Sequence, residues 1–385
     1  MKKQRAPTVR ANHAPFRPIE DMAAAATFTQ LKPVGVSMMS RFTAIVLAIA
    51  LVGAAVPASS QQTIKLRVAG NLLATGLIQQ NKEQPFFENL AKTTGLPLEV
   101  DYKPMDVIGI KDAEGLRVLK SGLFDVVSLR LAQVSRDEPF FLGLDVVGLN
   151  PNYEVARKVM TAYRDAFDQR LQERFNGKLL GLWPFGPQVL FCRVPIDGLS
   201  DLKGKKVRVY DQSLAKFIEQ IGGVPVAISF GEVQQALSRG VVDCAITGPS
   251  SANSAGWPEV TTHFMPIGFQ IAFNAYGMNL DSWKKLTADQ QSKIAAAFRK
   301  LESDIWDYSK HLFDDAVRCN VGKDPCTTVK KYNMVEVAVR DSDLQLIQGG
   351  LKSVAYPAWS DVCEKSYAGC SATWKKLLGP IAGIN

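Results

Sequence analysis

Residues 201–249 read DLKGKKVRVYDQSLAKFIEQIGGVPVAISFGEVQQALSRGVVDCAITGP, and this stretch decides the fold class. Charged and apolar residues alternate early in it, which is typical of a strand, and apolar residues then recur at helical spacing after Ser213, the expected N-cap. The pattern predicts strand, helix, strand, helix and strand at residues 206–210, 213–221, 224–229, 231–238 and 241–246. The stretch therefore predicts a parallel βαβαβ unit and an α/β fold.

A parallel unit of this kind binds ligands at the carboxyl ends of its strands. Two groups are expected at such ends, residues 208–211 on one strand and Thr247 on another. Arg208 has the sharpest chemistry, because a guanidinium offers a planar fork that matches a carboxylate. An arbitrary arginine is more often a surface residue at a strand edge, so residue type alone does not select Arg208.

The order of short motifs along this stretch is more specific than any one of them. It resembles the substrate-binding proteins of tripartite ATP-independent periplasmic (TRAP) transporters, which share the order DLKG-K-R-V, GG-P and EV--AL--G-VD. The resemblance implies that Arg208 binds a carboxylate. It also implies a receptor for an organic acid that serves membrane permease subunits, with transport driven by an ion gradient rather than by ATP.

Length and charge place limits on the organisation. The 385 residues allow two ordinary domains. Residues 1–60 carry seven basic and two acidic side chains, so only +3 of the formal +8 charge remains for residues 61–385. A nucleic-acid partner is not expected, because the folded part lacks a strong basic patch.

The first 60 residues read as a leader. An apolar run at 43–56 follows Arg41 and is shorter than the ~20 residues of a membrane span, which favours a secretory signal and a periplasmic location over a retained anchor. The residues before Met38 and Met39 are unusual for a signal, and translation is hypothesised to begin at one of these two methionines.

All six cysteines follow the leader, and an even number in an exported chain indicates disulfides. The spacing of seven in Cys319/Cys326 and in Cys363/Cys370 suits two local loop bridges. Cys192 and Cys244 lie in strand-like runs. They are expected either to form a disulfide between neighbouring strands or to be two buried free thiols, and the sequence leaves both alternatives open.

The first half repeats the α/β pattern. Strands are expected at 64–70, 98–103 and 124–128, with helices at 84–92 and 114–121, and LKSGLFDVV resembles the TRAP family signature. A long helix at 287–318 is expected to brace both domains, and 352–381 to form a helical tail. The predicted fold is periplasmic binding protein-like, with two α/β domains, several crossovers and a long bracing helix. The predicted domains are residues 61–185 with 273–312 and residues 186–272 with 313–385, and the chain is expected to change domain near Gly186.

Catalysis is not expected. The sequence has no GxSxG elbow, P-loop or HExxH motif, and its three histidines are better explained as packing or solvated residues. No cofactor motif is found, and a zinc site is disfavoured because no CxxC or nearby His pair accompanies the cysteines.

The remaining site predictions concern residues that would surround the ligand. Phe185 and Trp257 are candidate aromatic walls, with core packing as the alternative for Phe185. The resemblance implies polar contacts from Asn71, Gln188, Asp211 and Thr247. The chain departs from the family pattern at three places: Gln188 stands where many members have a second arginine, Thr247 where many have an asparagine, and Arg130 where some sugar-acid binders have an acid. Arg130 is hypothesised to balance a second negative charge on the ligand.

Three other functions remain open from the sequence. The first is a receptor for an ATP-driven importer, against which the long helix and the motif order argue. The second is an exported enzyme that acts on a carboxylate. The third is an exported structural protein with no ligand.

Overall fold

The structure is a computed structural model that describes residues 63–384. The predicted leader, secretory signal and alternative start sites lie outside the described residues. These residues form two β-sheets, which we name the first sheet and the second sheet. The first sheet has the order β2-β1-β3-β10-β4, with β1 (Ile64–Gly70), β2 (Leu98–Pro104), β3 (Val126–Arg130), β4 (Gly177–Pro187) and β10 (Ile271–Asn279).

The second sheet has the order β11-β9-β5-β8-β6-β7. Its strands are β5 (Val189–Cys192), β6 (Lys206–Val209), β7 (Val224–Ala227), β8 (Cys244–Thr247), β9 (His263–Met265) and β11 (Val335–Glu336). Strand β6 pairs parallel with both β7 and β8. The helices between them are α6 (Gln212–Gln220) and α7 (Val233–Ser238), so the βαβαβ unit predicted from residues 201–249 is confirmed.

The first half of the chain builds a similar unit in the first sheet. Strand β1 pairs parallel with β2 and β3, as the sequence predicts. Strand β10 returns much later in the chain and pairs antiparallel with β3 and β4. The helices that connect β1, β2 and β3 include α1 (Gln84–Glu88), α2 (Leu90–Thr94) and α3 (Gly115–Ser121). The helix expected at 84–92 is therefore interrupted at Asn89, which separates α1 from α2.

Short connections carry the chain between the sheets at two places, and a third passage runs from β10 through the long helix at 288–320 to β11. Strand β4 ends at Pro187 and β5 begins at Val189, so only Gln188 separates the two sheets there. This position is two residues beyond the predicted change at Gly186. The return lies between Met265 of β9 and Ile271 of β10. These two crossings agree with the predicted kind of fold, and the exact domain boundaries stay a prediction.

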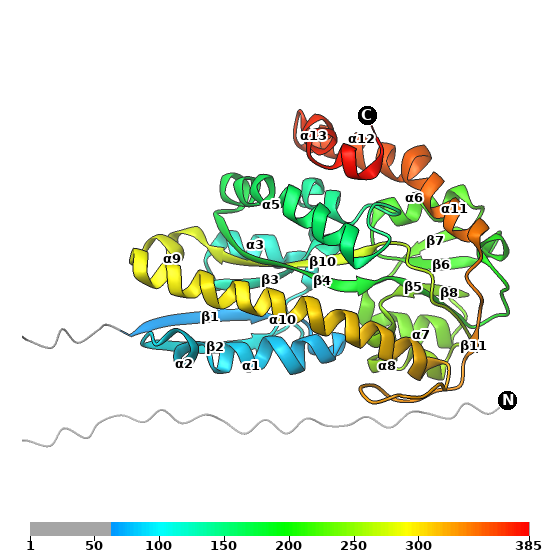
Figure 1. The fold of residues 1–385 in the computed structure, drawn as a ribbon, viewed down its shortest axis with the longest axis horizontal. Coiled ribbons are helices and arrows are strands. Elements are labelled where there is room, and N and C mark those ends of the chain that lie inside the picture. Colours follow the sequence, from blue (N-terminus) through cyan, green and yellow to red (C-terminus); the bar gives the residue numbers. More distant parts are fainter. Residues whose placement is uncertain (1–62, 385) are drawn as a thin grey trace, which may run out of the picture. The chain divides into compact units, whose positions relative to one another are not determined.

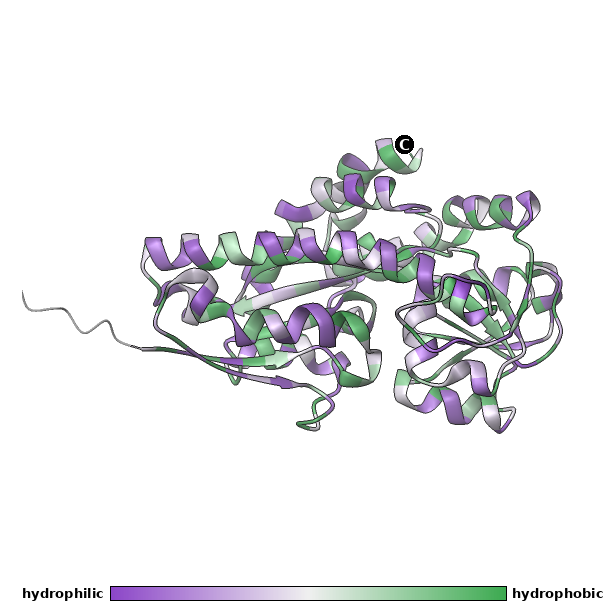
Figure 2. Ribbon diagram, turned by 60° about the horizontal axis from the view of Figure 1, so that its bottom comes forward, coloured by the Kyte–Doolittle hydropathy of each residue, from purple (hydrophilic) through white to green (hydrophobic). Residues whose placement is uncertain are grey.

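The long helix α10 (Ala288–Asn320) has 33 residues and is about 50 Å long at 1.5 Å per residue. Its N-cap is Thr287, whose side chain accepts a hydrogen bond from the Gln290 N–H. Hydrophobic and hydrophilic residues alternate along it (Figure 2), and its apolar face packs on β4. It also contacts α8 (Pro249–Ser254), which follows β8, so the predicted brace between the two sheets is confirmed.

The C-terminal segment packs over a second long helix, α5 (Tyr153–Phe175), and over α6 (Figure 1). The segment consists of α11 (Asp341–Gly350), α12 (Tyr356–Ser366) and α13 (Cys370–Ala382). The indole N–H of Trp359 donates to the Pro139 carbonyl at 2.8 Å, and that of Trp374 donates to the Gly143 carbonyl at 2.8 Å. The predicted helical tail at 352–381 is therefore present and is tied to the body by buried polar contacts.

The N-cap of helix α6 differs from the prediction. Its N-cap is Asp211 rather than Ser213, because Asp211 has the extended backbone of a cap and its Oδ1 accepts from the Leu214 N–H at 2.9 Å. Ser213 lies inside the helix, and its hydroxyl donates to the same carboxyl oxygen at 2.8 Å.

All six cysteines form disulfides. The two local pairs, Cys319–Cys326 and Cys363–Cys370, are the predicted ones. Cys192 and Cys244 face each other directly on β5 and β8 and are also bonded, which excludes the alternative of two free thiols. Within residues 63–384, no helix is long and apolar enough to cross a membrane.

Candidate functional site

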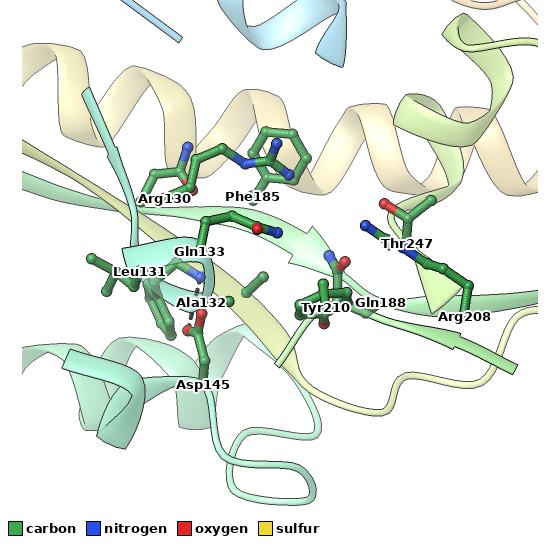
Figure 3. A pocket seen from close by; sticks show the side chains of 13 residues that line it. Arg130, Leu131, Ala132, Gln133, Asp145, Phe185, Gln188, Arg208, Tyr210 and Thr247 are labelled. Carbon is green, nitrogen blue, oxygen red and sulfur yellow. Dashed lines mark hydrogen bonds between the residues drawn. The ribbon is translucent and has the colours of Figure 1, made fainter. Parts of the chain in front are cut away.

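A cavity lies where side chains from the two sheets meet (Figure 3). About 340 Å³ of space lies among its lining atoms, including the part that opens to solvent. Its lining combines three positions of β10, the start of α4 (Leu131–Val134) and the carboxyl ends of several strands. The lining residues are Arg130, Leu131, Ala132, Gln133, Asp145, Phe185, Gln188, Arg208, Tyr210, Thr247, Ala272, Phe273 and Asn274.

Arg208 is held in this cavity by the second sheet. Its side chain is buried, with 1% of the residue exposed. The guanidinium donates from Nε to the Ile228 carbonyl at 3.0 Å and from Nη1 to the Ile246 carbonyl at 2.8 Å. No carboxylate among the described residues forms a salt bridge with it. Burial lowers the pKa of Arg208 to about 10, so the side chain is still a cation at neutral pH.

Arg130 enters the same cavity from the first sheet, at the end of β3. Unlike Arg208, it has an ionic partner, since its Nη1 lies 3.2 Å from Oδ2 of Asp112. Its guanidinium carbon lies 5.3 Å from the centre of the Phe185 ring and 5.8 Å from that of Phe230. The aromatic faces therefore help to fix a cation whose charge is largely balanced within the chain.

Three further residues lie where the two sheets meet. Gln188 is buried between β4 and β5, and its side-chain amide donates to the Gly186 carbonyl at 2.9 Å. Thr247 is the last residue of β8. Tyr210 follows β6, and its hydroxyl accepts from Gln270 at 2.8 Å. Burial raises the pKa of Tyr210 well above its ordinary value, so the hydroxyl keeps its proton.

The cavity contains three polar residues that the sequence did not single out, Gln133, Asp145 and Asn274. Asp145 is fully buried, and its Oδ1 accepts from the Phe273 N–H at 2.9 Å. The side-chain nitrogen of Asn274 is buried and has no hydrogen-bond partner in the described part of the chain. The sequence could have indicated two of these residues. Asp145 is an acid inside the apolar run 139–151, and Asn274 is an amide inside the apolar strand β10, and a buried polar residue requires a hydrogen-bond partner.

Of the eight predicted binding residues, the cavity brings together five and leaves three outside: Asn71, Asp211 and Trp257. Asn71 follows β1, and its backbone N–H donates to the buried carboxyl of Glu83 at 2.6 Å. Trp257 is fully buried and packs on Phe230, with ring centres 5.6 Å apart. Asp211 caps α6. Contact of these three residues with a ligand stays a prediction.

Metal binding has no support in the described part of the chain. Between residues 63 and 384, no three His, Cys, Asp or Glu side chains are grouped in a way that could hold a metal ion. The polar groups of the cavity are two guanidiniums, amides, hydroxyls and one carboxyl. This set can recognise an oxygen-rich organic anion through charge and hydrogen bonds.

Two α/β sheets joined by crossing strands, with a cavity between them, define the fold class of the periplasmic solute-binding proteins. The chain belongs to the family of bacterial extracellular solute-binding proteins, family 7 (DctP), whose model matches residues 73–318. The TRAP-type resemblance inferred from the motif order is therefore confirmed.

Among curated proteins, the chain is similar to the C4-dicarboxylate-binding periplasmic protein DctP of Rhodobacter capsulatus, with 26% identity over 217 residues. The match covers 55% of this chain and 64% of that protein. It is also similar to the sialic acid-binding periplasmic protein SiaP of Vibrio cholerae, with 20% identity over 68% of this chain and 81% of that protein.

Solved structures show the same fold. DctP7 of Bordetella pertussis, an extracytoplasmic solute receptor binding pyroglutamic acid, matches with a TM-score of 0.68 and 19% identity, over 82% of this chain and 99% of that one. A TRAP periplasmic solute-binding protein from Desulfovibrio salexigens with bound orotic acid matches with a TM-score of 0.71 and 17% identity, over 83% and 99%.

Proposed function

We propose that the protein is the extracytoplasmic solute receptor of a TRAP transporter. It binds an organic acid in the cavity between the two sheets and delivers it to membrane permease subunits. Membership in the family and the named ligands of its relatives support an organic acid as the class of ligand. They also favour this function over a receptor for an ATP-driven importer.

The observation that carries the proposal is the environment of Arg208. A buried cation without a carboxylate partner is unfavourable unless something else offsets the lost hydration. The carbonyls of Ile228 and Ile246 satisfy two of its N–H groups and supply no full negative charge. The remaining N–H groups can bind a carboxylate of the ligand, which would supply that charge.

Other residues of the cavity complete the ligand contacts. Arg130 balances a second negative charge when the ligand carries one, and Phe185 packs against its apolar part. Gln188, Thr247 and Asn274 hydrogen-bond to its oxygen atoms. Because these residues come from both sheets, binding favours the form in which the two sheets approach each other.

The protein acts in the periplasm, where a receptor can collect its ligand before delivery. The relatives are named as solute-binding proteins, which supports a binding rather than a catalytic role. A receptor releases the acid chemically unchanged, whereas an exported enzyme would convert it.

A thermal-shift screen of carboxylic acids tests the function. The panel contains pyroglutamate, orotate, galacturonate, malate and 2-oxoglutarate. An acid present at a hundred times its dissociation constant stabilises the protein by about 2.7 kcal/mol. Mass spectrometry of the recovered acid then separates binding from turnover. If every acid of the panel leaves the unfolding temperature unchanged, or if the acid is converted, the proposal is wrong.

A further inference from the structure

The carboxyl of Asp145 is the one acidic side chain that lines the cavity (Figure 3). It lies directly after a buried apolar turn, residues 139–144, and none of its surface is exposed to solvent. Neither the motif order nor the predicted elements assign it a function. Its position therefore calls for an explanation in terms of the ligand.

The two oxygens of this carboxyl have different surroundings. Oδ1 accepts a hydrogen bond from the Phe273 N–H at 2.9 Å. Oδ2 is buried and has no hydrogen-bond partner, and no salt bridge to Asp145 is found among residues 63–384. A carboxylate buried with one free oxygen and no counter-ion is very unfavourable, so a proton is expected to neutralise it.

The charges around Asp145 agree with the neutral form. Burial raises the pKa of Asp145 well above its ordinary range, and the negative charge of Asp211 raises it further, while the Phe273 N–H acts in the opposite direction. Tyr210 also lies near both carboxyls and keeps its own proton. The nearby cations are Arg208 and Arg130, which contact carbonyls and Asp112 instead.

The proton belongs on Oδ2, because Oδ1 already accepts from an N–H. The resulting O–H has no hydrogen-bond partner among the described residues. The side-chain nitrogen of Asn274 and Nη2 of Arg208 also have no hydrogen bond within residues 63–384. These three groups of the cavity are then donors, and a ligand with acceptor oxygens matches them.

We propose that Asp145 is a specificity-determining residue that donates a hydrogen bond from Oδ2 to an acceptor oxygen of the ligand. The proposal rests on the proposed function, because it concerns the same organic acid. The ligand carries, besides the carboxylate bound by Arg208, a keto, hydroxyl or carboxylate oxygen that faces Asp145. An acid with an ammonium group at that place is excluded, since it would meet another donor.

Two substitutions distinguish a neutral Asp145 that donates to the ligand from a charged Asp145 that accepts from it. Asp145→Asn keeps an acceptor for the Phe273 N–H and keeps a neutral donor in place of the O–H. Asp145→Ala removes both groups. With the five acids of the screen as probes, Asp145→Asn is expected to bind within about twofold of the wild type and Asp145→Ala about tenfold more weakly, as measured by titration calorimetry.

The pH dependence provides a second measurement. The acid-binding affinity of the wild type is expected to be constant while Asp145 keeps its proton and to fall as pH rises through the range, well above that of an ordinary aspartate, in which Asp145 loses it. Asp145→Asn should remove this fall. Asp211→Asn is the matched control, because Asp211 is the other nearby carboxyl with a raised pKa. If the fall in affinity disappears in Asp211→Asn but persists in Asp145→Asn, the proposal is overturned.

The outcomes are distinct. If Asp145→Asn binds as weakly as Asp145→Ala, the carboxylate is charged and accepts from the ligand, and the proposal is wrong. If neither variant alters binding, Asp145 is structural, and the proposal is again wrong. If Asp145→Ala does not fold, the pH profiles of the wild type and Asp145→Asn still decide. Failure of the proposed function looks different, because the wild type then binds none of the acids.

Discussion

The first sheet buries unpaired carboxyls, whereas the second sheet buries an unpaired arginine besides the carboxyl of Asp211. Beside the first sheet lie two fully buried carboxyls, Glu83 and Asp145, and neither has a cationic partner among the described residues. In the second sheet, Arg208 is buried without an anionic partner. The difference matters because a carboxyl can lose its charge by taking up a proton, whereas an arginine stays charged at physiological pH. Only the second sheet therefore needs an anion from outside the chain.

The largest expected effect comes from removing this uncompensated cation. Arg208→Ala should weaken binding of the acid found in the screen by roughly 100-fold, because the ligand carboxylate would remain buried without its partner. Titration calorimetry measures the effect. Arg239→Ala is the matched control, since Arg239 is an exposed arginine after α7 and lies outside the cavity. Equal affinity in the two variants would contradict the assignment of Arg208 as the anchor.

The second expected effect concerns the buried carboxyl of Glu83. Burial raises the pKa of Glu83 to about 7, against hydrogen bonds from Asn71, Tyr276 and Tyr102. The folded protein thus binds a proton that the unfolded chain releases near pH 4.5, so this group's contribution to stability falls as pH rises from there to about 7. The fall is on the order of 3 kcal/mol for a shift of this size.

Urea unfolding at a series of pH values measures this contribution. Glu83→Gln should reduce the fall in unfolding free energy between those two pH values, because glutamine does not titrate. Glu88→Gln at the end of α1, the helix that directly follows Glu83, is the control, as Glu88 is exposed. A wild-type curve that Glu83→Gln leaves unchanged would show that the buried carboxyl does not lose its charge in this way.

A smaller effect is expected at Arg130, whose charge Asp112 already balances. Arg130→Ala should weaken binding of dicarboxylates such as malate by about tenfold, and of monocarboxylates by less. Comparing the two classes by calorimetry tests the second-charge hypothesis. The hypothesis fails if the affinity for every acid is unaffected.

The smallest effect concerns Asp211, which lies beside the cavity but caps α6. Asp211→Ala should lower the unfolding free energy by about 1 kcal/mol, the usual loss for a helix N-cap, while Asp211→Asn should lower it much less because asparagine also caps well. Urea unfolding measures both. If Asp211→Ala instead abolished acid binding and left stability intact, the role predicted from the sequence would be the correct one.

The fold was predictable to the level of elements because its signals are local. Alternation at 206–210 and helical spacing after it depend on residues a few positions apart, and β6 and α6 appear within a residue or two of the expected ends. The position of the N-cap was missed because Asp211 and Ser213 are both good capping residues, and only the backbone conformation decides between them.

The candidate site was predictable where its residues end a strand. Arg130, Arg208 and Thr247 come from the carboxyl ends of parallel strands, a place that the pattern itself identifies. Asp145 was missed because its neighbour in the site, Phe273, is 128 positions away. Trp257 looked like a wall of the site because glycine and proline flank it, but its ring is buried against Phe230 and Phe191.

The sequence by itself determined the α/β class, the strands that carry Arg208 and Thr247, and the TRAP-type resemblance, since all three depend on order and spacing along the chain. Only the tertiary structure decided which side chains meet in the cavity and which charges are balanced there. Arg130 forms a salt bridge with Asp112, whereas Arg208 forms none with the residues that the structure describes. This follows from how the two sheets pack, because the strength of an electrostatic contact depends on distance and burial rather than on residue type.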